Sequence, residues 1–108
     1  AQTGVLGKES SMPAYMVIVA RIKDRARFLE EYGKPAADLV ARMGGRYVVR
    51  APGAVSLEGA YGAGASIVIS EWPDRGAIER FWASPEYARL KAARQTLADV
   101  DVLVVEQA

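Results

Sequence analysis

A run of residues that is apolar on both of its alternating faces is the feature that most limits how this chain can fold. Residues 15–22 read YMVIVARI, and apolar side chains dominate both sets of alternate positions. Because successive side chains of a β-strand point to opposite sides of the sheet, this pattern predicts a strand that is covered on both sides. The fold must therefore supply cover for two faces of one sheet.

The rest of the chain alternates between strand and helix patterns. Further strands are expected at residues 46–50, 65–72 and 101–106, with a weaker candidate at 55–58. Helical spacing occupies residues 24–43, where Gly33 and Pro35 predict a kink or two short helices, and residues 73–97, where Pro85 restarts the helix. This order folds most simply as an α+β domain of the ferredoxin-like βαββαβ type. It has a four-stranded antiparallel sheet with both helical segments on one face.

The length supports one domain, which we expect to occupy residues 12–108. Residues 1–11 are small, polar and without periodicity, and they are expected to be a loose extension or a tag remnant that the fold does not need. Helices on one face would leave the other apolar face of the sheet uncovered. A large exposed apolar patch of this kind favours association with another protein surface. A second copy packed against that face would cover it, so the sequence predicts a homodimer.

Composition removes several kinds of chemistry. The chain contains no Cys and no His, so it has no thiol nucleophile, imidazole base or imidazole metal ligand, and neither a metal nor a cofactor is expected. Fourteen Lys and Arg against thirteen Asp and Glu leave a net charge of +1, which is no basic excess for nucleic acid. The third strand also lacks the basic and paired aromatic residues of RNA-binding domains. No apolar run is long enough for a membrane span, and a cytoplasmic protein is expected.

Several sequence blocks occur in an order that matches a known family. They are MPAY at residues 12–15, GGRYVVR at 44–50, LEG at 57–59, EWP at 71–73, WASPEY at 82–87, ARQ at 93–95 and LVVE at 103–106. The chain resembles domain-of-unknown-function family 1330, of the dimeric α/β-barrel superfamily of ferredoxin-like dimers, although Trp72 stands where that family usually has Phe. The resemblance implies the fold and dimerisation but no reaction. By analogy only, superfamily relatives include cofactor-free monooxygenases, lactone isomerases and haem enzymes, and haem without His would need an unusual ligand.

Arg50 and Glu71 are the main candidates for a chemical centre. Arg50 ends the second strand, where its planar guanidinium could bind a carboxylate or enolate oxygen, or could simply be an exposed charge. Glu71, near the end of the third strand, could be a base with a shifted pKa or one half of a structural ion pair. Antiparallel pairing of these strands predicts that the two side chains share a cavity, although the register is open and a slip of one residue would separate them.

A second group of candidates comes from the helical segments. Trp82 and Tyr87 could form an aromatic wall with the Tyr87 hydroxyl in a pocket, or could be ordinary core residues at a helix corner. Arg94 follows on the same helix and could reach back to Glu86 or Glu71. Tyr15, on the first strand, is expected to line the barrel.

The glycine-rich stretch at residues 59–64 is not expected to bind phosphate. It lacks the Lys-Ser/Thr pair of a P-loop, and a strand follows it rather than a helix. We interpret it as a hairpin loop or a lid.

These observations favour a dimeric barrel that binds a small apolar or aromatic molecule. Such a protein could be a cofactor-independent enzyme of the monooxygenase type, which desolvates and orients a substrate that supplies its own electrons. It could equally be of the isomerase type, for which Glu71 is the best internal base. The alternative is a non-catalytic ligand sensor or a structural dimer. The sequence does not name a reaction.

Overall fold

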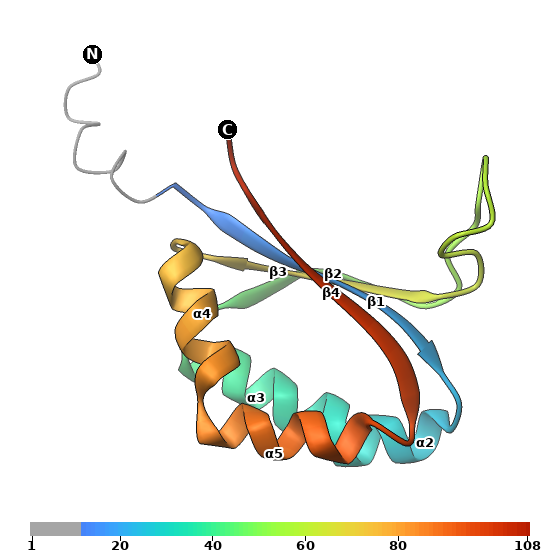
Figure 1. Ribbon diagram of the computed structural model, residues 1–108, viewed down its shortest axis with the longest axis horizontal. Coiled ribbons are helices and arrows are strands. Elements are labelled where there is room, and N and C mark those ends of the chain that lie inside the picture. Colours follow the sequence, from blue (N-terminus) through green and yellow to red (C-terminus); the bar gives the residue numbers. More distant parts are fainter. Residues whose placement is uncertain (1–11) are drawn as a thin grey trace.

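The computed structural model describes residues 12–108, which form one four-stranded sheet and a layer of helices. The elements in chain order are β1 (Ala14–Ile22), α2 (Arg25–Phe28), the π-helical turn η1 (Leu29–Gly33), α3 (Lys34–Arg42), β2 (Arg46–Ala51), β3 (Ser66–Trp72), α4 (Arg75–Ala83), α5 (Pro85–Arg94) and β4 (Ala98–Glu106). The sheet order is β2-β3-β1-β4, with every neighbouring pair antiparallel. All helices lie on one side of the sheet (Figure 1). The predicted ferredoxin-like fold is confirmed.

One strand boundary differs by more than one residue from that expected, and one expected strand is not formed. β4 begins at Ala98 rather than at residue 101, because its first residues continue the pairing with β1 as far as Ile22 opposite Ala98. Residues 55–58 are not a strand but part of the long β2–β3 connection. The expectation for residues 1–11 lies outside the residues that the structure describes. None of the helices within residues 12–108 is long and apolar enough to cross a membrane.

The predicted interruption of the first helical segment takes the form of a π-turn. Asp24 caps α2 by accepting a hydrogen bond from the backbone N–H of Arg27 at 3.1 Å. Pro35 has no N–H, so the α-helical hydrogen-bond ladder cannot run through this region unbroken. The backbone N–H of Lys34 instead donates to the carbonyl of Leu29, which is the i→i−5 spacing of a π-helix. The wider turn directs Tyr32 inward, where it is buried.

Large side chains fill the space between the sheet and helices α3, α4 and α5. The ring of Phe81 lies 5.1 Å from that of Trp72 and 4.7 Å from that of Tyr87, measured between centroids, and all three are buried. Gly45 packs flat on Trp72, since a Cβ at this position would lie 2.6 Å from the indole ring. Gly44, with φ at 104°, ends α3 in the left-handed conformation that favours glycine. We call this region the closed end.

The opposite face of the sheet carries no helices in the described part of the chain. Its apolar side chains come from all four strands and include Val17, Val49, Ile67, Ile69 and Leu103. The connection between β2 and β3 forms an arm that projects to the same side, away from the helices (Figure 1). Val55 and Leu57 on this arm are 85% and 99% exposed.

Candidate functional site

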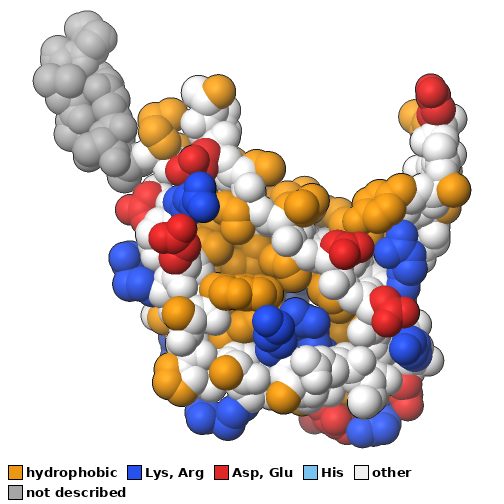
Figure 2. Space-filling view, viewed as in Figure 1, with side chains coloured by type: hydrophobic (Ala, Val, Ile, Leu, Met, Phe, Trp, Pro, Cys, Tyr) orange, Lys and Arg blue, Asp and Glu red, His pale blue; other side chains and the backbone are white. Residues whose placement is uncertain are grey.

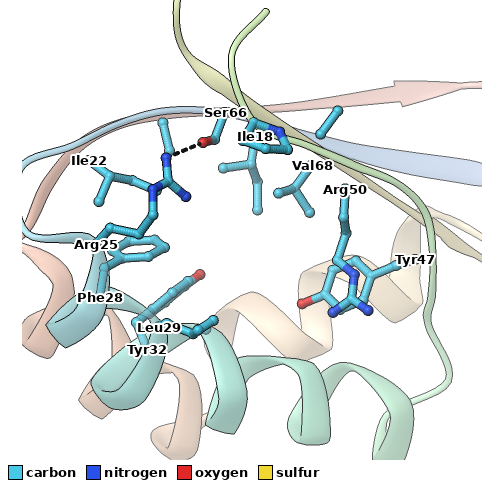
Figure 3. Close-up of a pocket in the computed structure, with 14 residues that line it drawn as sticks. Ile18, Ile22, Arg25, Phe28, Leu29, Tyr32, Tyr47, Arg50, Ser66 and Val68 are labelled. Carbon is cyan, nitrogen blue, oxygen red and sulfur yellow. Dashed lines mark hydrogen bonds between the residues drawn. The ribbon is translucent and has the colours of Figure 1, made fainter.

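A cavity of about 250 Å³ lies between the sheet and the segment formed by α2 and η1. Figure 3 shows its walls, with the strands above and the helical segment below. Most of the lining is apolar and includes Ile18, Ala20, Ile22, Phe28, Leu29 and Val68. Its polar members are Arg25, Tyr32, Tyr47, Arg50 and Ser66. We call this region the open end.

Small residues create the space. Ala20 and Ser66 are direct partners on β1 and β3, and both point toward the helices. At the other end of the same two strands, Ala14 is paired with Trp72, whose indole fills the layer. Gly33 is the last residue of η1 and lines the cavity. Because it has no side chain, it leaves space where the helical segment approaches the sheet. The open end is therefore encoded by small side chains at facing positions.

Two arginines flank the cavity from different elements. Arg25, at the start of α2, donates a hydrogen bond from Nη2 to the Ser66 hydroxyl at 3.3 Å. Arg50, on β2, lies with its guanidinium carbon 4.9 Å from the centroid of the Tyr47 ring. Burial raises the pKa of the Tyr47 hydroxyl, which therefore stays neutral. Both arginines are exposed, so they lie at the rim of the cavity rather than at its floor (Figure 3).

The prediction that Arg50 and Glu71 share a cavity is wrong, and a β-bulge is the reason. Val48 has no partner in β3, and the register shifts between Tyr47 and Val49. An unbroken ladder would place Arg50 on the same face as Glu71, but the extra residue reverses the alternation. Arg50 therefore pairs with Val68 and faces the helices, while Glu71 faces the other side of the sheet.

Glu71 belongs to a polar group on the far face of the sheet. It forms an ion pair with Arg46, its partner on β2, and accepts a hydrogen bond from the Tyr15 hydroxyl at 3.1 Å. This hydrogen bond raises the pKa of Tyr15. Tyr15 therefore does not line the helix-side cavity, and Glu71 takes the structural ion-pair role that the sequence left open.

Tyr32 and Tyr87 connect the cavity to the core. Their hydroxyl groups are 2.8 Å apart, and Tyr87 also accepts a hydrogen bond from Nη2 of Arg94 at 3.4 Å. Burial is the main reason why the pKa of Tyr32 lies far above its usual range. Tyr87 itself is buried beneath the cavity wall rather than part of it. Arg94 is held by this tyrosine, not by Glu86 or Glu71 as the sequence suggested.

Trp82 lines a different and more open hollow. Figure 2 shows apolar side chains gathered between β4 and helices α4 and α5. The hollow is lined by Met16, Arg75, Ile78, Glu79, Trp82, Val102 and Val104. Lys91 covers the outer face of the indole, with Nζ 4.7 Å from the ring centroid. Arg50 and Trp82 therefore line two separate hollows. Ile18 and Val102 are partners on neighbouring strands, and Ile18 lines the cavity of Arg50 while Val102 lines the hollow of Trp82.

Sequence reasoning missed four of the five polar residues around the cavity: Arg25, Tyr32, Tyr47 and Ser66. One signal was present, because the Gly33 and Pro35 interruption marks the π-turn that carries Tyr32, and such turns are frequent at functional sites. The pairing of Ala20 with Ser66 depends on the strand register, which the sequence pattern does not give.

The comparisons with known proteins agree with this architecture. The family model described as domain of unknown function DUF1330 matches residues 13–108. The RPA0582 protein of unknown function from Rhodopseudomonas palustris is 18% identical, with a TM-score of 0.73 over 100% of this chain and 94% of that chain. SnoaB from Streptomyces nogalater, described as a cofactor-independent oxygenase, is 18% identical, with a TM-score of 0.66 over 91% of this chain and 95% of that chain. No curated protein matches the chain. At these identities the solved structures show the fold alone.

Proposed function

Because the chain belongs to the DUF1330 family, whose description names no activity, we propose its function from the site itself: it binds a small apolar or aromatic molecule in the cavity at the open end, as a homodimer. The observation that carries this proposal is the cavity. An apolar hollow with a few convergent polar groups is the usual form of a small-molecule site. Its volume of about 250 Å³ favours a ligand of one or two rings.

The homodimer part of the proposal rests on the bare face of the sheet. Leu103 and Val105 are about half exposed there, and Ile67 and Ile69 of β3 lie on the same face, with β1 between the two strands. A second copy is the occupant that best fits this face, because each copy would cover the apolar strands of the other and neither would be left bare. The arm that carries Leu57 projects to this side and would reach the partner. A monomeric mass at micromolar concentration by light scattering would contradict this part.

The cavity favours an oxygenase-like reaction over an isomerase-like one. An isomerase needs a positioned base, and the carboxylate expected to serve, Glu71, lies on the other face of the sheet. A cofactor-independent oxygenase needs a substrate that supplies all the electrons, as in R₂CH₂ + O₂ → R₂C=O + H₂O. The protein then has to desolvate and orient that substrate. The description of the Streptomyces nogalater neighbour makes this the reaction to test first.

Binding is tested by calorimetric titration with 2-naphthol, a neutral probe of suitable size. The wild-type protein should bind it saturably, and Val68→Phe, which places a ring inside the cavity, should weaken binding at least tenfold. Val102→Phe is the matched control, since this valine also lies on a strand and faces the helices but lines the other hollow. Absence of binding, or equal loss in both variants, would overturn the proposal.

Catalysis is tested separately with 1,3-dihydroxynaphthalene in chelator-treated buffer. Its keto tautomer has the required CH₂ group, and oxidation to 2-hydroxy-1,4-naphthoquinone consumes one O₂ and releases one water. Oxygen uptake that the wild-type protein accelerates and Val68→Phe does not would support an oxygenase. Binding without accelerated uptake would favour the alternative, a non-catalytic ligand sensor.

A further inference from the structure

We propose that the ligand carries a negative charge, that this charge binds Arg25 or Arg50 at the rim, and that the apolar body lies between the sheet and η1. This inference rests on the proposed function and specifies the ligand class: a flat, mainly apolar carboxylate, enolate or phenolate. It assigns a role to Arg25, which the sequence pattern does not single out.

The placement of the two guanidinium groups is the first reason. Arg25 comes from α2 and Arg50 from β2, and Figure 3 shows them on opposite sides of the cavity. Each is held in place, Arg25 by its hydrogen bond to Ser66 and Arg50 by stacking against Tyr47. A guanidinium group has five N–H donors in a planar fork, and neither side chain uses more than one of them in these contacts.

The missing counter-charge is the second reason. No Asp or Glu of the described part of the chain lines the cavity. In residues 12–108 the arginines that form ion pairs are Arg27, Arg42, Arg46 and Arg75, and none of these lines the cavity. Arg27 shows the contrast best, because it shares α2 with Arg25 but points outward to Glu31. The cavity therefore has a local excess of positive charge.

A third arginine increases this excess from behind the cavity wall. Arg94 is 7% exposed, and its guanidinium carbon lies 5.6 Å from the centroid of the Tyr32 ring, which lines the cavity. Its Nε has no hydrogen-bond partner within the described residues. Charge interactions are screened less in a partly enclosed site than in water. The field of the three arginines therefore favours an anion and opposes a cation.

This charge distribution also bears on the reaction. An enol or phenol bound beside Arg25 and Arg50 would lose its proton more easily, because the guanidinium groups stabilise the anion. The enolate or phenolate is the more electron-rich form of the substrate. An oxygenase that uses electrons from the substrate alone would gain from this shift, and the proton would pass to solvent water at the exposed rim.

The test compares 2-naphthoate with 2-naphthamide, which have nearly the same shape and differ in charge. Titration calorimetry of the wild-type protein should show that naphthoate binds about tenfold more tightly, as expected for a hydrogen-bonded charge. Arg25→Gln and Arg50→Gln should each reduce this preference several-fold, and the double variant should lose most of it, keeping at most the small part that Arg94 contributes. Arg27→Gln is the matched control and should keep the wild-type preference. High salt should reduce the preference but leave naphthamide binding unchanged.

The outcomes separate the two proposals. Equal binding of both compounds to the wild-type protein would overturn the anion proposal and leave small-molecule binding intact. A preference that stays at the wild-type level in the double variant would also overturn it, since the charge would then be recognised elsewhere. If neither compound nor 2-naphthol binds, the proposed function itself fails. Thermal unfolding of each variant identifies any loss of binding that comes from misfolding.

Discussion

The two ends of the helix-facing layer use the same strands in opposite ways. At the closed end, Trp72 and Phe81 fill the space between β-sheet and helices, and both are at most 2% exposed. At the open end, Ala20 and Ser66 occupy the facing positions and leave a cavity. Protein interiors are normally packed as densely as organic crystals. The same two strands therefore support a densely packed aromatic core at one end and a cavity, the proposed ligand site, at the other.

Phe81→Ala should give the largest effect, at the closed end. Removing this ring leaves a void against Trp72 and Tyr87, and such truncations cost about 3–5 kcal/mol of unfolding free energy. Urea denaturation measures the change. Leu29→Ala is the contrasting variant at the open end, where the side chain is 52% exposed and its loss should cost much less. Equal losses would remove the distinction between the two ends.

Enlarging an alanine to valine should have different effects on stability at the two ends of β1. At the closed end there is no free volume for a larger side chain beside Trp72. Ala14→Val should therefore lower the free energy of unfolding by about 1–3 kcal/mol through overpacking. Ala20→Val at the open end should change stability by less than about 1 kcal/mol, because the methyl groups enter the cavity. It should also weaken 2-naphthol binding. Chemical denaturation and calorimetry of the same two variants test this, and a costly Ala20→Val would mean that the cavity has no spare room.

The tyrosine pair at the boundary between the ends should also respond to truncation. Tyr87→Phe removes the hydroxyl that contacts both Tyr32 and Arg94, leaving two buried polar groups less satisfied, and should cost about 1–3 kcal/mol. Tyr47→Phe is the comparison, because its hydroxyl forms no side-chain hydrogen bond in the described structure. If Tyr87→Phe lowers the free energy of unfolding no more than Tyr47→Phe does, the hydrogen bonds of the buried tyrosine pair contribute nothing to stability.

Tyr32 should make the protein less stable at alkaline pH. Its pKa is raised in the folded state, so the folded protein holds this proton more tightly than the unfolded chain. The stabilisation is complete below the ordinary tyrosine pKa of about 10 and decreases as the pH rises above it. Unfolding free energies measured between pH 8 and 11 should therefore fall less steeply for Tyr32→Phe than for the wild-type protein. Parallel curves would contradict burial of this hydroxyl.

The smallest stability change is expected for Arg50→Gln, at the rim of the open end. The residue is exposed and forms no ion pair with a carboxylate of residues 12–108, so the free energy of unfolding should change by less than about 1 kcal/mol. The binding preference for naphthoate should nevertheless fall. A large destabilisation would assign Arg50 to the structure rather than to the ligand.

Local signals in the sequence predicted most of the fold. Asp24 and Ser84 cap their helices by accepting backbone hydrogen bonds, and Gly44 ends α3 with a positive φ. These features depend on neighbouring residues alone, so a sequence pattern contains them. The two-sided apolar run likewise predicted a strand there, and β1 lies between β3 and β4 in the sheet.

The candidate site was less predictable, because it depends on pairing between distant segments. The bulge at Val48 decides which face Arg50 joins, and RYVVR has no residue that marks it. The cavity arises only when Ala20 and Ser66 face each other, and neither residue is unusual in its own strand. Arg50 was identified as a site candidate, whereas its expected partner Glu71 was placed on the wrong side of the sheet.

A crystal structure of the protein with 2-naphthoate tests the central claim most directly. We expect the naphthalene ring between Ile18, Phe28 and Val68, with the carboxylate within hydrogen-bonding distance of Arg25 or Arg50. A ring bound instead in the hollow beside Trp82, or on the face of the sheet that carries Glu71, would contradict the assignment of the open end as the ligand site.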